Sequence, residues 1–173
     1  SLMGCYGLMM NMRHLSLFLL GLMFACADPS HENGQTVAAG YLMFVGTYTK
    51  ETSKGIQAYR FDPATGTATD LGLVAEMREP SFLALHPSNK YLYALSEIDD
   101  YDAAKSGSIT AFSIDTAGGK LTKLNEVSSR GAWPCHLNVN SSGSMLIVAN
   151  YAGGSIASFP VNDDGTLGEA VSF

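Results

Sequence analysis

The sequence predicts an all-β fold of the β-propeller type, and three observations carry that prediction. From residue 41 to residue 173, short apolar or alternating runs rich in Val, Ile, Tyr, Phe and Thr are separated by Gly, Pro, Asn or Asp. No stretch in this range has the sustained 3.6-residue period of a helix. The third observation is an internal repeat near 50 residues, the length typical of one four-stranded blade.

The first set of repeated segments pairs a strand, a tight polar turn and a second strand. "PSFLALHPSNKYLYALSE" from Pro80 aligns with "PCHLNVNSSGSMLIVANY" from Pro134, which lies 54 residues later. In this alignment Leu83 meets Leu137. A second set interleaves with the first: "GIQAYRFDPATG" from residue 55, "GSITAFSIDTAGGKL" from residue 107 and "GSIASFPVNDDGTL" from residue 154. Each begins at a glycine and ends in a Gly-containing turn typical of a hairpin.

The segments predict eleven strands, which make fewer than three four-stranded blades. The expected strands begin near Tyr41, Gly55, Thr69, Ser81, Tyr91, Ser108, Lys120, His136, Met145, Ser155 and Gly168. A propeller closes with at least four blades, and an unclosed one exposes long sheet edges. We therefore expect residues 41–173 to be the first part of a propeller in a longer protein, or to require assembly. A sandwich or open sheet of eleven strands is the alternative, but it does not explain the repeat.

Composition and charge restrict the function. The 173 residues are 46% hydrophobic and 15% charged, as in a globular domain, and the formal net charge is -6. An acidic chain without a basic stripe is not expected to bind nucleic acid. Small molecules or proteins remain as partners.

Residues 1–27 resemble a secretory signal, with the true start at Met10 or Met12. From Met12 the chain reads "MRHLSLFLLGLMFACADPS": a basic residue, an apolar run too short to span a bilayer, and then small residues. "LMFAC" favours lipidation at Cys26, whereas "ACA" before Asp28 fits ordinary signal peptidase. Both predict an exported protein, in the periplasm or anchored by the lipid at the outer membrane or cell surface. Residues 28–40 are small and polar, as in a flexible tether.

Signal removal leaves a single cysteine in the mature chain. Cys5 is lost and Cys26 is lost or acylated, so Cys135 has no intrachain partner for a disulfide. Without a second feature that indicates chemistry, Cys135 is predicted to be a small buried hydrophobic residue and not a nucleophile.

The repeat alignment also proposes a site. The innermost strand of each blade runs beside the propeller axis, and its first residues reach one mouth of the channel. Because Phe82 and His136 are equivalent in the two copies, we expect them to face the same region. A histidine there can act as general base or acid, or can join blades through hydrogen bonds.

The repeated segments, with "FVGTYTKETSKGIQAYRFDPATG", resemble the seven-bladed lactonase family, which includes bacterial 6-phosphogluconolactonases and fungal carboxymuconate cyclases. The resemblance covers residues 41–173 in family order. It implies a propeller with its active site at the channel mouth, no metal or other cofactor, and a small-molecule lactone or sugar as partner. It also matches His136 to the histidine of the family. Related enzymes take a further carboxylate and arginines from later blades.

Three more residues are candidates for substrate binding. Arg130 lies six residues before His136 and can pair with a carboxylate or phosphate, although a solvated turn residue is the alternative. Asn150 and Tyr151 end a predicted inner strand and either line the site or cap the strand.

The acidic loop "EIDDYDAAKSG" lacks the EF-hand spacing, and "AGGKL" and "YAGGS" do not complete a phosphate-binding loop. We interpret these as a solvated loop and two hairpin turns.

The sequence supports three functional hypotheses. The first is an exported lactonase that opens a sugar lactone while His136 assists attack by water. The second is a non-enzymatic propeller lipoprotein that binds carbohydrate or protein. The third is a cycloisomerase that forms a lactone on the same scaffold. Fold analogy alone does not separate them.

Overall fold

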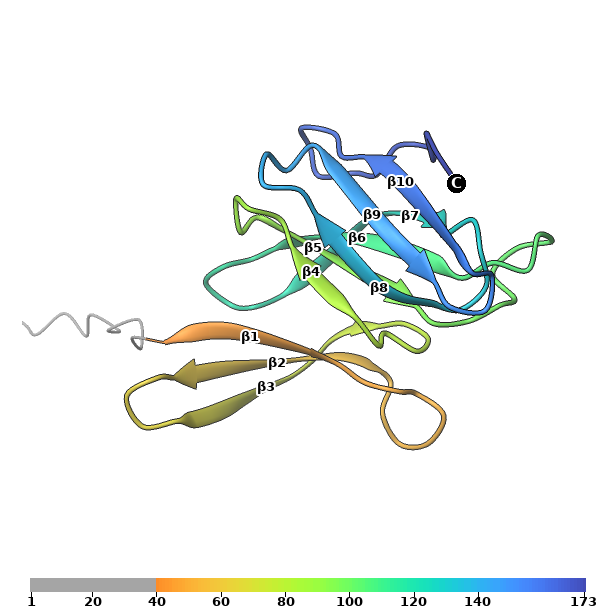
Figure 1. The fold of residues 1–173 in the computed structure, drawn as a ribbon. Coiled ribbons are helices and arrows are strands. Elements are labelled where there is room, and N and C mark those ends of the chain that lie inside the picture. Colours follow the sequence, from red (N-terminus) through yellow and green to blue (C-terminus); the bar gives the residue numbers. More distant parts are fainter. Residues whose placement is uncertain (1–39) are drawn as a thin grey trace, which may run out of the picture. The chain divides into compact units, whose positions relative to one another are not determined.

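The computed structural model describes residues 40–173, which form ten strands in three antiparallel sheets (Figure 1). The predicted signal region with Met10, Met12 and Cys26, and the predicted tether up to residue 39, lie outside the described residues. No helix in residues 40–173 is long and apolar enough to cross a membrane.

The three sheets follow one another along the chain. The first sheet contains β1 (Tyr41–Gly46), β2 (Gly55–Asp62) and β3 (Thr67–Glu76). The second contains β4 (Leu83–Leu85), β5 (Tyr91–Ser96), β6 (Ser108–Ile114) and β7 (Leu121–Ser128). The third contains β8 (Pro134–Val139), β9 (Met145–Asn150) and β10 (Ser155–Pro160). In each sheet, strands that are consecutive in sequence are hydrogen-bonded neighbours.

The strand registers confirm the internal repeat. Leu83 of β4 lies opposite Ala94 of β5, and 54 residues later Leu137 of β8 lies opposite Val148 of β9. The glycines at 55, 107 and 154 stand where β2, β6 and β10 begin. The second sheet is thus a whole four-stranded blade, the third sheet holds the first three strands of the next, and the first sheet holds the positions of strands two to four.

The prediction of eleven strands was wrong in one place. The strand expected near Gly168 is not formed; that segment makes only two isolated bridges to the third sheet, Val161 with Leu167 and Ser158 with Ser172. The strand expected near Ser81 begins at Leu83.

The junction of the second and third sheets contains the larger core. Ten buried residues form it, and they include Tyr93, Ile109, Leu137, Val148 and Phe159. Hydrogen bonds tie the segment after β10 to the edge of this core. The Tyr93 hydroxyl donates to the Gly165 carbonyl at 3.1 Å, and the Asn125 side-chain amide bonds to the carbonyl and the amide of Leu167.

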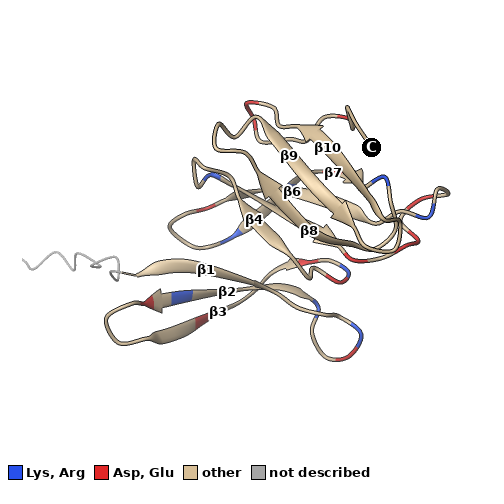
Figure 2. Ribbon diagram, in the orientation of Figure 1, with Lys and Arg blue, Asp and Glu red and all other residues tan. Residues whose placement is uncertain are grey.

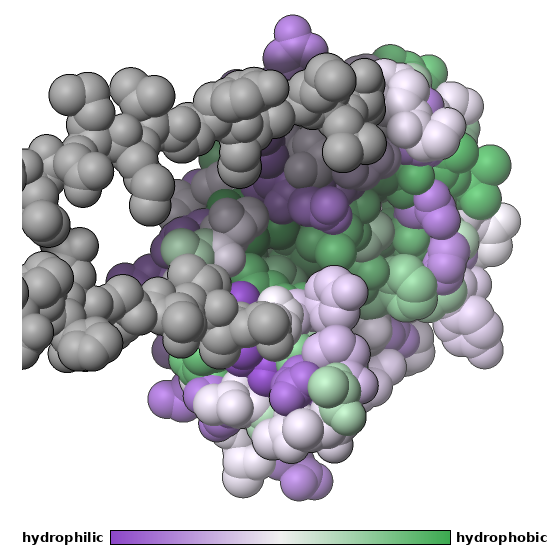
Figure 3. All heavy atoms as spheres, turned by 90° about the vertical axis from the view of Figure 1, so that its left-hand side faces the viewer, coloured by the Kyte–Doolittle hydropathy of each residue, from purple (hydrophilic) through white to green (hydrophobic). Residues whose placement is uncertain are grey.

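The junction of the first and second sheets is looser. Its core has four buried residues, Ile56, Leu92, Ala94 and Phe112. An apolar cleft of about 440 Å³, lined by residues of β1, β2, β4 and β5, remains there. The surface at the end of the sheets where β1 begins is correspondingly hydrophobic (Figure 3). Charged residues lie mainly in the connections between strands (Figure 2). Candidate functional residues in residues 40–173 are therefore sought at the strand ends.

Candidate active site at the strand ends

One end of the three sheets gathers equivalent residues from both repeat copies. Strands β1, β5 and β9 end there, and β4 and β8 begin there, because the strands alternate in direction. We call this end the mouth. From the first copy it receives Glu79, Ser81, Phe82 and Glu97, from the second Trp133, Cys135, His136 and Tyr151, and from the end of β1 Tyr48.

The mouth brings Phe82 and His136 together, as the alignment predicted. Their ring centroids are 4.4 Å apart and their planes are tilted by 53°. The His136 side chain is exposed, and among residues 40–173 neither ring nitrogen has a hydrogen-bond partner. Phe82 therefore supports the imidazole from one side and leaves its nitrogens open to a substrate or water.

A β-bulge explains why His136 is exposed. Pro134 pairs with Asn150 and His136 with Ala149, so Cys135 is an extra residue on β8. A bulge breaks the alternation of side chains and commonly turns a side chain toward a site. The prediction that Cys135 is buried was therefore wrong: the bulge exposes both Cys135 and His136, and the Cys135 thiol faces the Ala149 carbonyl at 3.7 Å.

The first copy has the same backbone at its strand start. The Leu95 amide donates to the Phe82 carbonyl and the Glu97 amide to the Glu79 carbonyl, which again leaves one extra residue. Glu79 and Trp133, each before a proline, both have left-handed φ values, 45° and 53°. Such a conformation is disfavoured for these residue types. Two copies that keep it indicate a built feature of the mouth.

The Asn150 side chain is buried and is held by hydrogen bonds to residues on either side of it. It is 3% exposed, and its amide donates to the Ser129 carbonyl at 3.0 Å and the Ser155 hydroxyl at 3.3 Å. Tyr151 follows it, is 72% exposed, and donates its backbone amide to the Trp133 carbonyl. The two candidates therefore differ in the structure: Asn150 is buried and bonded to the turn before β8, and the Tyr151 side chain is exposed at the mouth.

Arg130 lies in the turn that Asn150 fixes. Its φ is 63°, and its guanidinium carbon lies over the Phe173 ring, 4.1 Å from the centroid. A cation held in this way can still reach an anion, because stacking leaves the guanidinium N–H groups in its plane.

The sequence interpretation missed the polar residues of the first copy. Tyr48 donates its hydroxyl to a Glu97 carboxylate oxygen at 3.0 Å, and Thr49 donates to Glu79 from its backbone amide and its hydroxyl. The repeat alignment could have identified these residues. The alignment that equates Phe82 with His136 also equates Glu79 with Trp133 and Glu97 with Tyr151.

The other motifs behave as turns and loops. Gly119 and Gly154 both have positive φ in hairpin connections, as predicted. In the acidic loop, Asp100 pairs with Arg78 at 3.0 Å and Asp102 accepts from the Ala104 amide. Among residues 40–173, no group of three or more His, Cys, Asp or Glu side chains is placed to hold a metal ion.

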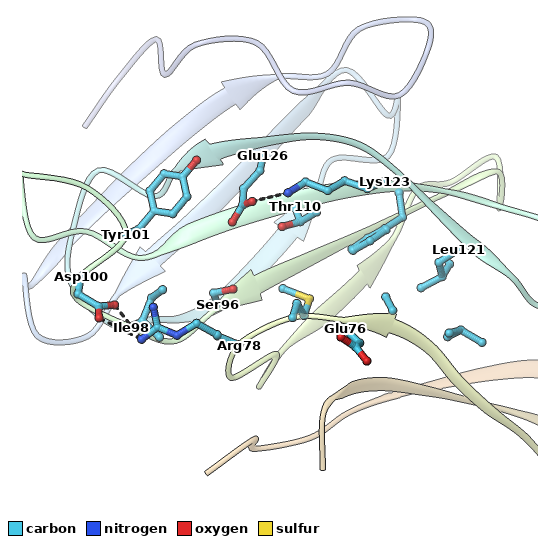
Figure 4. A pocket seen from close by; sticks show the side chains of 14 residues that line it. Glu76, Arg78, Ser96, Ile98, Asp100, Tyr101, Thr110, Leu121, Lys123 and Glu126 are labelled. Atoms are coloured by element: carbon cyan, nitrogen blue, oxygen red, sulfur yellow. Dashed lines mark hydrogen bonds and ion pairs between the residues drawn. The ribbon is translucent and has the colours of Figure 1, made fainter. Parts of the chain in front are cut away.

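A cavity of about 440 Å³ lies apart from the Phe82–His136 pair, between β3 and the β6–β7 hairpin (Figure 4). Arg78 and Asp100 face each other on one side of it, and Lys123 contacts Glu126 at 2.6 Å on the other. Because these charges neutralise one another within the cavity wall, it offers less to a polar ligand than the mouth does.

The chain forms successive antiparallel sheets of one repeated pattern, and polar residues gather at one end of their inner strands. This arrangement is that of a β-propeller, of which the chain is a part. Residues 42–173 match the family model described as "Lactonase, 7-bladed beta-propeller". The chain belongs to this family.

Named relatives agree with the family match. The chain is 34% identical to a 6-phosphogluconolactonase of Bacillus subtilis over 132 residues, which are 76% of this chain and 36% of the relative. It is similar to the crystal structure of a putative 6-phosphogluconolactonase from Bacteroides uniformis, with TM-score 0.70, 37% identity, and coverage of 77% of this chain and 37% of that one. The periplasmic gluconolactonase PpgL of Pseudomonas aeruginosa gives TM-score 0.69 and 34% identity, with coverage of 76% and 38%. The chain thus spans little more than a third of the length of these proteins.

Proposed function

We propose that the protein is an exported lactonase that opens a sugar lactone, with His136 as general base. The observation that carries the proposal is the exposed imidazole on the β8 bulge. Its ring centroid lies 4.4 Å from that of Phe82, and its nitrogens have no hydrogen-bond partner among residues 40–173. The relatives named as lactonases support the reaction class.

The chemistry begins with water beside the ester carbonyl. His136 takes a proton from the water while the water oxygen attacks the carbonyl carbon. The tetrahedral intermediate then expels the ring oxygen. The leaving alkoxide takes that proton back, so the product is the open hydroxy acid. The developing oxyanion needs a cation or N–H donors, and we propose Arg130 as the cation.

Export rests on the N-terminal segment. We propose that the signal region in residues 1–27, with its true start at Met10 or Met12, directs secretion. The mature protein then either carries a lipid on Cys26 or is cut before Asp28. The periplasmic gluconolactonase among the similar structures supports this location.

The test is hydrolysis of phosphorylated and plain gluconolactone by the complete gene product. Replacement His136→Ala should lower kcat by about 100-fold or more, since general-base assistance contributes on that order. Cys135→Ala is the matched control, because Cys135 is the exposed neighbour on the same bulge, and it should keep full activity. Failure of the folded wild-type protein to hydrolyse either lactone would contradict the proposal, as would an active His136→Ala variant.

A further inference from the structure

Three buried side-chain oxygen atoms among residues 40–173 have no hydrogen-bond partner, and all three belong to residues at the mouth end. They are Glu79 Oε2, Ser81 Oγ and Asn150 Oδ1. A buried polar atom without a partner is costly and therefore needs an explanation. Since two of the three flank Pro80 in the first copy, that copy lacks donors that something else must supply.

Glu79 is the most costly of these groups. Its residue is only 7% exposed, yet only one carboxylate oxygen is used: Oε1 accepts from the Thr49 amide at 3.3 Å and the Thr49 hydroxyl at 3.1 Å. Its backbone is in the disfavoured left-handed region. Strained backbone and unpaired polar groups cluster where a protein binds or reacts.

Tyr48 and Glu97 complete the group and make it accessible. Tyr48 is 61% exposed and donates to Glu97 Oε2, while Glu97 Oε1 is neither buried nor hydrogen-bonded within the described chain. The hydrogen bond to Glu97 and the charge of that carboxylate raise the pKa of Tyr48, and burial and the charge of Glu79 add smaller contributions. The exposed phenol and the second Glu97 oxygen are therefore the parts of the group that a ligand reaches first.

The group accepts hydrogen bonds far more than it donates them. Its ligand must therefore supply donors, and it must not be an anion, because two carboxylates would repel it. Among residues 40–173, no group of three or more His, Cys, Asp or Glu side chains is placed to hold a metal ion there. Hydroxyl groups of a neutral polyol meet both conditions.

We propose that Tyr48, Glu79, Ser81 and Glu97 form a subsite that binds the hydroxyl groups of a polyhydroxylated lactone. The inference rests on the proposed function and specifies it. The subsite lies on the first copy, next to Phe82, so the hydroxylated side of the ring faces these acceptors while the ester faces His136 across the Phe82 ring. Any anionic group of the substrate is then directed away from this subsite.

The test uses lactams, which mimic the ring but resist hydrolysis, titrated by calorimetry into the complete gene product. Wild type should bind gluconolactam at least about tenfold more tightly than the unsubstituted six-membered lactam, because hydrogen bonds to charged groups contribute this much or more. Glu97→Gln should remove most of that preference. Glu76→Gln, which deletes the same charge at the end of the outer strand β3, should keep it. Equal affinity of wild type for the two lactams, or an unchanged preference in Glu97→Gln, would overturn the proposal.

Ser81→Ala separates a binding role from a structural one. Because the Ser81 hydroxyl is buried and has no hydrogen-bond partner within residues 40–173, its removal should leave the melting temperature of the unliganded protein unchanged or higher. Gluconolactam affinity should fall by about three- to tenfold. A lower melting temperature with unchanged affinity would show that the hydroxyl serves the fold and would overturn its place in the subsite.

Hydrolysis of plain gluconolactone, measured on the same samples, distinguishes the two claims. Selective lactam binding without hydrolysis would support the subsite and contradict the lactonase proposal. Hydrolysis without any preference for the hydroxylated lactam would support the lactonase and contradict the subsite.

Discussion

The two repeat copies carry different chemistry on the same backbone. Both begin their inner strand with a left-handed residue before proline and a bulge, yet the first copy places Glu79 and Phe82 where the second places Trp133 and His136. The first copy is rich in acceptors, and two of its buried side-chain oxygens have no hydrogen-bond partner among residues 40–173, whereas the second is aromatic and exposes an imidazole. The comparison teaches that the repeat fixes the backbone positions at the mouth, whereas the side chains of each copy determine the chemistry at those positions.

Exchanging the two rings is the strongest way to break this comparison. The double variant Phe82→His, His136→Phe keeps both side chains but moves the imidazole across a pair whose centroids are 4.4 Å apart. We expect kcat for lactone hydrolysis to fall by about 100-fold or more, since small misplacements of a catalytic group have effects of this size. The unfolding temperature should change little. Activity near that of wild type would show that the copies are interchangeable and that position at the mouth does not assign function.

The two hydrophobic cores should contribute differently to the free energy of unfolding. Leu137 is 1% exposed in the larger core, and its equivalent Leu83 is half-buried against the smaller one. Urea denaturation should show that Leu137→Ala lowers the free energy of unfolding by about 2–5 kcal/mol, as buried leucines do. Leu83→Ala should cost roughly 1–2 kcal/mol, in the ordinary range for less buried sites. Equal losses would mean that the two junctions are equally packed.

The smallest expected effect concerns Tyr93, whose equivalent in the second copy is the exposed Ile147. Burial, with smaller contributions from Tyr91 and Asp164, raises the pKa of Tyr93 to about 12. Unfolded tyrosine loses its proton near pH 10, so the folded state holds the proton more tightly, and stability falls as the pH rises from about 10 toward 12.

Replacement Tyr93→Phe tests this alkaline loss. The variant should lack that part of the loss, while at neutral pH it should lose about 1 kcal/mol with the hydrogen bond to Gly165. The measurement is urea denaturation of both proteins between pH 8 and pH 12. Parallel curves over this range would contradict the assignment.

Much of the fold could be predicted from the sequence, because strand alternation and turn residues repeat at a fixed spacing. That spacing placed Leu83 with Leu137 and brought Phe82 to His136, as the registers and ring contact confirm. The exposure of Cys135 could not be predicted, because one extra residue in a strand reverses the alternation and leaves no mark in composition.

The acidic side of the mouth was missed for a different reason. Glu97 begins a loop that contains several more acidic residues, and such loops are ordinarily solvated. Only the contact with Tyr48, a residue 49 positions away, shows that its carboxylate faces another strand end. Long-range contacts of this kind depend on how neighbouring sheets pack, which local patterns do not contain.

Chemical rescue tests the central claim, that His136 is the base, most directly. The folded His136→Ala variant of the complete gene product is assayed for gluconolactone hydrolysis with increasing imidazole, against the same imidazole series on wild type. If His136 is the base, imidazole should restore the rate in proportion to its concentration in the variant and leave the wild-type rate nearly unchanged after subtraction of the uncatalysed reaction. A variant that keeps its activity, or one that is inactive, folded and unaffected by imidazole, would contradict the role assigned to His136.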